Sequence, residues 1–238
     1  MGKLFLIRHA FTPANNASYN NQRGLWKIAL DKDMPIEMEY GVNQALELGE
    51  FLNDFKGKIL IYRSPYYRVK QTLDYALTKM NGDYEIKVLD DLYEFNSGVH
   101  YAHTISEVLE MYPESKRYFE DAKKDLESAI YTGGESRNMV RDRVKDVAKR
   151  FEEDILKNDY DYIFVFSHGM VNRYIYYWLV GENLQNDMKN CEVLSVSDRK
   201  SLFIPKTFVP KGFMVDIDKY IGNNKCYTKK VDRYWLIW

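Results

Sequence analysis

Four short apolar runs, each about as long as a β-strand, constrain the fold of this chain more than any other feature. They cover residues 3–7, 58–62, 84–89 and 162–167. The first, second and fourth runs lack polar alternation, which is typical of strands that are buried on both faces of a parallel sheet. Such strands need helices on both faces to exclude water.

Helical periodicity occupies the stretches between these runs. Residues 41–55 place one stripe of apolar side chains along a helix, and residues 136–157 place another. The stripes consist of Ala45, Leu48, Phe51, Leu52 and Phe55, and of Met139, Val140, Val144, Val147, Phe151 and Ile155. Strands that alternate with helices predict a three-layer α/β/α fold, in which helices cover both faces of a mostly parallel central sheet.

The 238 residues are enough for a substantial core, and we expect a single domain over 1–238. Residues 95–132 are polar and helical in character, so we expect a small helical cap insertion over one end of the sheet. After about residue 190 the chain becomes irregular, because Pro205 and Pro210 break any helix. We expect two more strands near 192–197 and 213–217. We also expect the aromatic stretch 234–238 to pack as an edge strand or as a homodimer contact.

Charge and cysteine content exclude several classes of partner. Lysine and arginine total 34 against 35 acidic residues, so no overall field attracts nucleic acid or an anionic membrane. Cys191 and Cys226 have neither zinc-binding spacing nor the density of a disulfide framework. The first apolar run is too short for a signal peptide or a membrane span. We therefore expect a cytoplasmic protein, and any anion site must be local.

Polar residues follow the ends of all four predicted strands. The carboxyl ends of parallel strands meet at one edge of the sheet, where ligands of open α/β proteins bind, so these residues are expected to converge. Together they form a cationic site that contains a single acid. The residues are Arg8 and His9 after the first run, Arg68 after the second, Glu94 after the third, and His168 with Gly169 after the fourth.

Each of these residues also has a structural interpretation when it is taken alone. A histidine at a strand end is often a hydrogen-bonded structural residue, Arg68 could be a solvated helix residue, and Glu94 could be a surface acid. Arg63 precedes a Ser-Pro pair and is interpreted as structural. The agreement among four strand ends is what favours a functional site.

Five segments in order resemble the signature of the histidine phosphatase superfamily, which has the phosphoglycerate mutase-like fold. The resemblance covers about residues 3–180, and its phosphatase branch fits best because the insertion between Glu94 and Gly133 is short. The segments read LIRHAFTPANN (6–16), RSPYYRVKQT (63–72), LYEF (92–95), GGES (133–136) and VFSHGMVNR (165–173).

The resemblance implies a metal-independent phosphomonoesterase that acts on a small phosphorylated metabolite without a cofactor. His9 would be the nucleophile that forms a phosphohistidine, and Glu94 would be the proton donor. Phosphoryl oxygens would be held by Arg8, Arg68 and His168, with further contacts from Asn15 and the Gly169 amide.

The chemistry of phosphate esters requires these residue types. Such esters are extremely inert, so positioning and charge stabilisation must lower most of the barrier. Arg8 and Arg68 offer planar donor forks, and His168 adds a third cation when it is protonated. His9 must be neutral to attack, with its other ring nitrogen held by a backbone carbonyl. Glu94 must be protonated, so burial and bound phosphate must outweigh the arginines that lower its pKa.

Three alternatives remain open from the sequence. A phosphoglycerate mutase-type phosphoryl transfer would use the same residues, and a metal-dependent hydrolase would use His9 and His168 as ligands. A non-catalytic phosphate-binding module is suggested by Ala10, which replaces the glycine usual in the first motif and is expected to alter the backbone slightly.

Three secondary features have both structural and functional interpretations. Ser136 is expected to cap the helix that follows GGES. His100 and His103 have helical spacing but no third ligand nearby, so a metal site is not expected. Tyrosines of the cap line the substrate entrance or serve ordinary packing, and they include Tyr93, Tyr101 and Tyr112.

Overall fold

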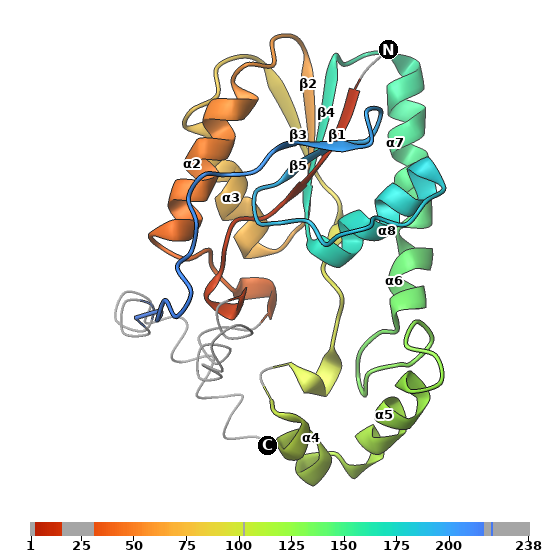
Figure 1. Ribbon diagram of the computed structural model, residues 1–238. Coiled ribbons are helices and arrows are strands. Elements are labelled where there is room, and N and C mark those ends of the chain that lie inside the picture. Colours follow the sequence, from red (N-terminus) through yellow and green to blue (C-terminus); the bar gives the residue numbers. More distant parts are fainter. Residues whose placement is uncertain (1–2, 16–30, 102, 217–219, 221–238) are drawn as a thin grey trace.

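The computed structural model describes residues 3–15, 31–101, 103–216 and 220 (Figure 1). Within them, a six-stranded sheet has the order β3-β2-β4-β1-β5-β6. The first four strands in the chain run parallel, whereas the last two are antiparallel to their neighbours. The strands are β1 (Lys3–Arg8), β2 (Ile59–Arg63), β3 (Tyr84–Val88), β4 (Tyr162–Ser167), β5 (Val193–Ser195) and β6 (Lys200–Phe203).

Helices cover both faces of this sheet, and each face has its own buried apolar cluster. Phe5 and Ile61 point into one cluster, and Leu6 and Leu60 point into the other, as strand alternation requires. The predicted three-layer α/β/α architecture is therefore confirmed. The helices are α2 (Tyr40–Leu52) and α3 (Tyr67–Leu77) on the first face, and α6 (Arg137–Arg143), α7 (Lys145–Lys157) and α8 (Gly169–Val180) on the second.

Two further helices, α4 (Ile105–Met111) and α5 (Lys116–Ala122), form the helical insertion. They lie beyond the carboxyl ends of the parallel strands, apart from the two helical layers (Figure 1). Thr104 begins α4 with a capping box, since its hydroxyl accepts from the Glu107 amide. The insertion is joined to the sheet by short 3-10 turns at Asp90–Leu92 and Gly98–His100.

The strand register brings distant parts of the chain to one edge. In the β1–β4 pair, Arg8 lies opposite Ser167. These residues end the two strands, and a histidine follows each of them, His9 and His168. In the β2–β4 pair, Arg63 lies opposite Phe166, and the Ser64 amide donates to the Phe166 carbonyl. In the β2–β3 pair, Arg63 lies opposite Val88, so backbone pairing alone brings all four predicted strand ends to this edge.

The strand predicted near 213–217 is wrong for its described residues, 213–216. Gly212 has a positive φ, and the Phe213 amide donates to the Pro210 carbonyl, so the backbone turns here. The sixth strand is β6, which forms a hairpin with β5 across a turn that contains Arg199 at positive φ. β5 lies within the range predicted near 192–197. The stretch 234–238 lies outside the described residues.

The helical stretch 136–157 forms two helices rather than one, because it is interrupted at Val144. Five of its six expected core positions are buried or pack against the core. Met139 is 45% exposed instead. Its sulfur lies 3.5 Å from the Ser136 amide at the first turn of α6, which explains why it leaves the stripe.

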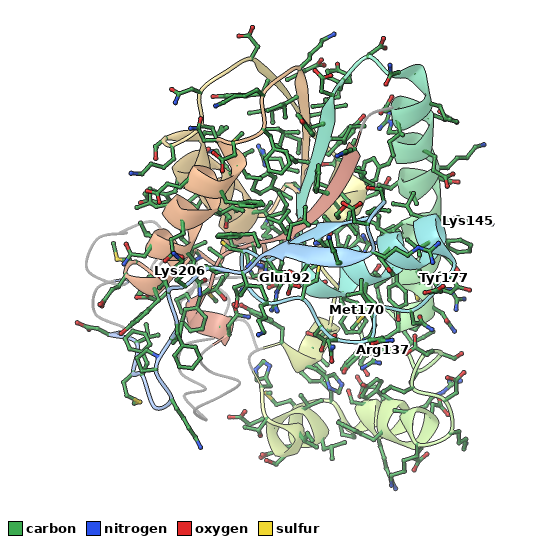
Figure 2. All side chains as sticks on the ribbon, turned by 45° about the horizontal axis from the view of Figure 1, so that its top comes forward. Arg137, Lys145, Met170, Tyr177, Glu192 and Lys206 are labelled. Carbon is green, nitrogen blue, oxygen red and sulfur yellow. The ribbon has the colours of Figure 1, made fainter. Side chains whose placement is uncertain are left out.

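The segment after β6 is bonded to α2. The Glu47 carboxylate accepts from the amides of Lys206 and Thr207, and Lys206 marks this segment in Figure 2. The buried Gln44 has two partners, because its Oε1 accepts from the Phe11 amide and its Nε2 donates to the Thr207 carbonyl. No helix in the described part of the chain is long and apolar enough to cross a membrane.

Candidate active site

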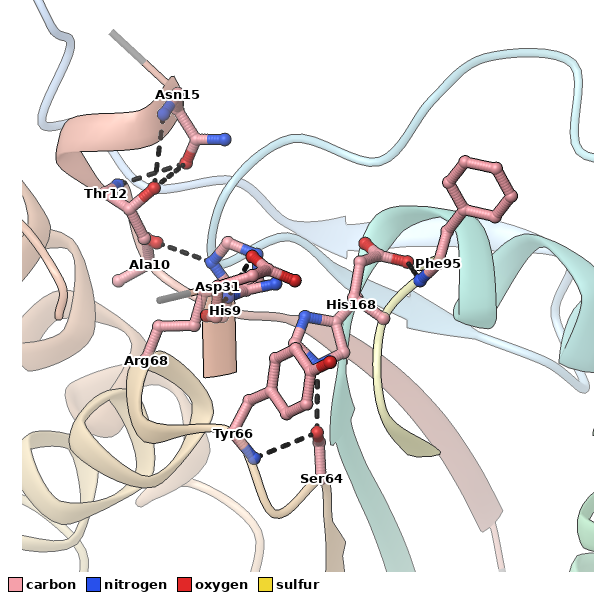
Figure 3. Close-up of polar contacts among 11 residues, drawn as sticks. His9, Ala10, Thr12, Asn15, Asp31, Ser64, Tyr66, Arg68, Phe95 and His168 are labelled. Atoms are coloured by element: carbon pink, nitrogen blue, oxygen red, sulfur yellow. Dashed lines mark hydrogen bonds and ion pairs between the residues drawn. The ribbon is translucent and has the colours of Figure 1, made fainter. Parts of the chain in front are cut away.

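A cavity of about 330 Å³ lies at the carboxyl edge of the parallel strands. Six of the seven residues predicted for the site line it, namely Arg8, His9, Asn15, Arg68, Glu94 and Gly169. The seventh, His168, is not a lining residue, but its ring centroid is 5.2 Å from that of His9, which lines the cavity (Figure 3). The structure therefore brings all seven residues together.

His9 is buried, and its ring is oriented by its own loop. Nδ1 lies 2.8 Å from the Ala10 carbonyl oxygen. A carbonyl can only accept, so Nδ1 carries the proton and Nε2 keeps its lone pair. Burial, followed by the charges of Arg68 and Arg8, holds the pKa of His9 well below its usual value. The imidazole is thus neutral at physiological pH, as a nucleophile must be.

Arg8 packs its guanidinium over the start of α8. A Cβ placed on Gly169 would lie 3.6 Å from Arg8 Nε, which is an ordinary van der Waals distance, so the guanidinium lies directly over this first residue of the helix. Arg8 Nη1 donates to the Met188 carbonyl at 2.5 Å, which fixes the fork. The twelve-residue helix α8 begins here, and its amino end adds partial positive charge to the same side of the cavity.

Arg68 is buried and held by a residue that the sequence did not single out. Its Nη1 donates to the carbonyl of Asp31 at 2.6 Å and to Asp31 Oδ1 at 3.0 Å (Figure 3). The Tyr66 ring lies 4.9 Å from its guanidinium carbon. Asp31 also lines the cavity, so a carboxylate occupies donors that a phosphoryl group would use.

Glu94 has the opposite response to burial. Its pKa is raised above the usual value by burial, although the Phe95 amide, Arg68 and Arg8 act to lower it. Its Oε1 accepts from the Phe95 amide at 2.9 Å. The cavity thus favours a carboxylic acid that can give up a proton.

His168 is completely buried and contacts Ser64, another residue missed from the sequence. Its Nε2 lies 2.8 Å from Ser64 Oγ, while Nδ1 has no hydrogen-bond partner among the described residues. Burial, followed by the charges of Arg68 and His9, holds the pKa of His168 well below its usual value. His168 is therefore neutral in the unliganded protein and not a third cation. A Ser64 hydroxyl that donates to Nε2 leaves the ring proton on Nδ1.

Asn15 supports the loop that follows His9. Its Oδ1 accepts from the Thr12 amide at 3.1 Å and from the Thr12 hydroxyl at 3.0 Å. The side-chain nitrogen of Asn190, Nδ2, donates both to Asn15 Oδ1 and to the His9 carbonyl. These bonds use the oxygen of Asn15, so Nδ2 is the atom suited to donate toward an anion in the cavity.

Ala10 fits the position where the family pattern has glycine. It is fully buried, its amide donates to Thr72 Oγ1 at 2.9 Å, and its carbonyl binds His9. Ala10 is not among the described residues with positive φ, so its backbone is one that a side chain tolerates.

The secondary features have structural partners. Ser136 caps α6 by accepting from the Met139 amide, as predicted. His100 packs against Tyr131, and His103 binds the Val99 carbonyl. In the described ranges, no group of three or more His, Cys, Asp or Glu residues could hold a metal ion. Of the three cap tyrosines, Tyr101 alone is among the residues that line the cavity.

Comparisons with known proteins agree with this geometry. A family model described as the histidine phosphatase superfamily (branch 1) matches residues 4–201. A search of curated protein sequences found no significant match. Solved structures share the fold, at identities too low to show more than the fold.

An alpha-ribazole phosphatase from Shigella flexneri has 20% identity and a TM-score of 0.65, with 90% of this chain and 96% of that chain covered. A mycobacterial glucosyl-3-phosphoglycerate phosphatase has 18% identity and a TM-score of 0.61, with 82% and 89% covered. A phosphoserine phosphatase mutant from Entamoeba histolytica, in complex with phosphoserine, has 20% identity and a TM-score of 0.58, with 82% and 90% covered.

We predict that the free energy of unfolding falls on acidification below pH about 6.5, the usual pKa of histidine. The unfolded chain binds protons at His9 and His168, whereas the folded chain does not because both pKa values are lowered. At pH about 5 the loss of unfolding free energy, relative to neutral pH, has an upper limit of about 2 kcal/mol for each histidine, which is reached when the folded chain binds no proton there. Urea unfolding in phosphate-free buffer measures it.

The matched variants are His9→Asn with His168→Asn, and His103→Asn as the control. The double variant should lose most of this pH dependence, and the control should keep it. An equal slope in all three proteins would contradict the neutral state assigned to the buried pair.

We also predict that Asp31→Asn binds inorganic phosphate about fivefold more tightly, a gain of about 1 kcal/mol for a partly exposed charge. The substitution removes a carboxylate that competes for Arg68 and repels the anion. Titration calorimetry measures the change, with Asp33→Asn as a control for net charge. Equal effects of the two variants, or weaker binding by Asp31→Asn, would contradict the competition.

Proposed function

The chain belongs to the histidine phosphatase superfamily, branch 1, and on this premise we propose that it is a phosphomonoesterase working through a phosphorylated His9. The observation that carries the proposal is the state of His9. It is a neutral imidazole whose Nε2 is available, and it lies in a cavity that two arginines also line. A neutral nucleophile beside fixed cations is what attack on an anionic ester requires.

In the first step, His9 Nε2 forms a bond to phosphorus while the bond from phosphorus to the ester oxygen breaks. Glu94 gives its proton to that oxygen, so an alcohol leaves and a carboxylate remains. The ring then carries positive charge, which the bond from Nδ1–H to the Ala10 carbonyl stabilises. Arg8 and Arg68 hold the phosphoryl oxygens, and the Asp31 carboxylate must yield Arg68 to the substrate.

In the second step, water attacks phosphorus and gives a proton to the Glu94 carboxylate. The bond from nitrogen to phosphorus breaks, its electron pair returns to His9 Nε2, and inorganic phosphate leaves. Both residues are restored, so the cycle needs neither a metal ion nor a cofactor. His168 contributes through Nδ1–H, and Asn15 and the Gly169 amide are further donors to the phosphate.

The substrate we propose is a small phosphorylated metabolite. A cavity of about 330 Å³ is at the small end of ligand sites, so it suits a phosphoryl group with a compact alcohol. The solved structures described above are named for three different phosphate esters, which supports the class and no single member.

The reaction can be tested by labelling. A phosphatase of this kind should take up acid-labile radioactive phosphorus from labelled p-nitrophenyl phosphate during rapid quenching. His9→Ala should abolish the label, since no other described residue is assigned to accept it. Label that persists in His9→Ala would overturn the proposal.

The role of Glu94 predicts a dependence on the leaving group. Glu94→Gln should slow alkyl phosphates by about 10²- to 10⁴-fold, because an alkoxide needs a proton to leave. Nitrophenolate leaves without one, so p-nitrophenyl phosphate should lose less than about 10-fold. Steady-state kcat/KM for both esters gives the comparison, and equal losses would remove Glu94 from its role as acid.

A further inference from the structure

We propose that Glu135 is a positioning residue for Glu94, an inference that rests on the proposed function of Glu94 as acid. Glu135 belongs to the GGES turn, whose serine caps α6. Glu135 is not among the residues that line the cavity. Its contacts instead lead to the loop that carries Glu94.

The carboxylate of Glu135 binds that loop on both sides of Glu94. Its Oε1 accepts from the Tyr93 hydroxyl at 2.9 Å, and its Oε2 accepts from the Asn96 amide at 3.0 Å. The residue before Glu94 and the residue two after it are therefore tied to one carboxylate. Hinging of the loop about Glu94 would break one of these bonds.

Arg143 of α6 binds the same carboxylate, and we call Glu135 and Arg143 together the clamp. Its guanidinium donates to both oxygens of Glu135 at 3.2 and 3.4 Å, and the two side chains are only 11% and 9% exposed. Nη1 of Arg143 also donates to the carbonyls of Asp91 and Tyr93, at 2.5 and 3.1 Å. The Tyr93 ring lies 3.5 Å from its guanidinium carbon. The loop is thus held through backbone groups as well as a side chain.

The backbones of the turn and the loop are in direct contact. The Glu135 amide donates to the Asn96 carbonyl at 2.8 Å, and the Val99 amide donates to the Thr132 carbonyl at 3.0 Å. A Cβ on Gly134 would lie 2.3 Å from the Asn96 oxygen, which no side chain can accept. Gly98, at positive φ, would place its Cβ 2.1 Å from the Thr132 oxygen. Two glycines therefore let the clamp approach the loop.

Glu94 depends on this clamp because its own side chain is weakly tethered. Among the described residues, its carboxyl group accepts one hydrogen bond, from the Phe95 amide of the same loop. The loop backbone therefore sets the place of the acid. A displacement of about 1 Å at a reacting group can cost about 100-fold in rate, so the clamp has a direct effect on proton transfer.

The buried ion pair of Glu135 and Arg143 is not explained by stability alone. Desolvation of a carboxylate and a guanidinium offsets much of their attraction, and apolar residues of the same volume often stabilise a fold as well. The bonds of Glu135 and Arg143 go to loop groups on either side of Glu94 rather than to the sheet. Their arrangement is that of a support for an active-site residue.

The test compares Glu135→Gln with wild type on an alkyl phosphate and on p-nitrophenyl phosphate. The amide places a donor against the Asn96 amide or against Arg143, so the clamp loosens while the volume is kept. We expect kcat/KM for the alkyl ester to fall about 10- to 100-fold, and that for p-nitrophenyl phosphate to change less than about threefold. His9-dependent labelling from the aryl ester should persist.

Glu127→Gln is the matched control. Like Glu135, Glu127 accepts from one tyrosine hydroxyl and one arginine. The donors are the hydroxyl of Tyr174 and the guanidinium of Arg137, the first residue of α6. Glu127 has no bond to the described loop 91–98, so its substitution should leave the ratio of the two esters unchanged. Tyr93→Phe is a milder variant that removes one bond of the clamp and should shift the ratio in the same direction.

A double-mutant cycle separates positioning from general stability. In a Glu94→Gln background, Glu135→Gln should have no further effect on the alkyl ester, because the acid is already absent. A ratio of the esters that stays at the wild-type value in both Glu135→Gln and Tyr93→Phe would overturn the positioning role. The role would also be overturned if Glu135→Gln lowered kcat/KM for the alkyl ester by the same factor in the Glu94→Gln background as in wild type. Failure of His9-dependent labelling in wild type would instead overturn the proposed function.

Discussion

The pairing of β1 with β4 is the constraint on which the site depends. Hydrogen bonds between these buried parallel strands place Arg8 opposite Ser167, and the two histidines follow one residue later on each strand. No side-chain attraction is needed to bring two imidazoles within 5.2 Å of each other, centroid to centroid. β2, on the other side of β4, adds Ser64 beneath His168 by the same means. A shift of register by one residue would turn every side chain of a strand to the opposite face and dismantle the site.

Burial then sets the chemistry of these residues in opposite directions. Removal from water disfavours charge, so it lowers the pKa of His9 and His168 and raises the pKa of Glu94. One low-dielectric environment thus shifts the pKa of each of these side chains toward its neutral form, downward for the imidazoles and upward for the carboxyl group. The two arginines supply the field that an anionic ester needs. Asp31 balances that field before substrate arrives, since it accepts from Arg68.

The fold and six of the predicted site residues were readable from local pattern, because these six follow the ends of the predicted strands. Asn15 came from the family resemblance alone. Apolar runs mark the buried strands, and Arg8, His9 and His168 stand where those runs end. Asp31 and Ser64 were not readable, since a polar residue in a loop looks the same whether it contacts solvent or an active-site side chain. The strand expected near 213–217 failed because Gly212 and Pro210 turn the chain, while the short, polar β6 lacks the apolar run that marks the others. The prediction that Met139 lies in the apolar stripe was wrong, because its sulfur accepts from a backbone amide at the start of α6.

The two bonds of Gln44 give the segment after β6 a bearing on catalysis. The family match ends at residue 201, yet the Thr207 carbonyl accepts from the same buried amide that holds the Phe11 backbone, two residues after His9. Trimming the protein back to the length of its family pattern would remove both the acceptor of this donor and the segment that is bonded to α2 beside it. The Gln44 side chain would then be less firmly held, and with it the backbone of Phe11 in the loop after His9. A minimal version of this protein therefore has to keep the segment that crosses α2, or replace Gln44 with a side chain that satisfies Phe11 alone.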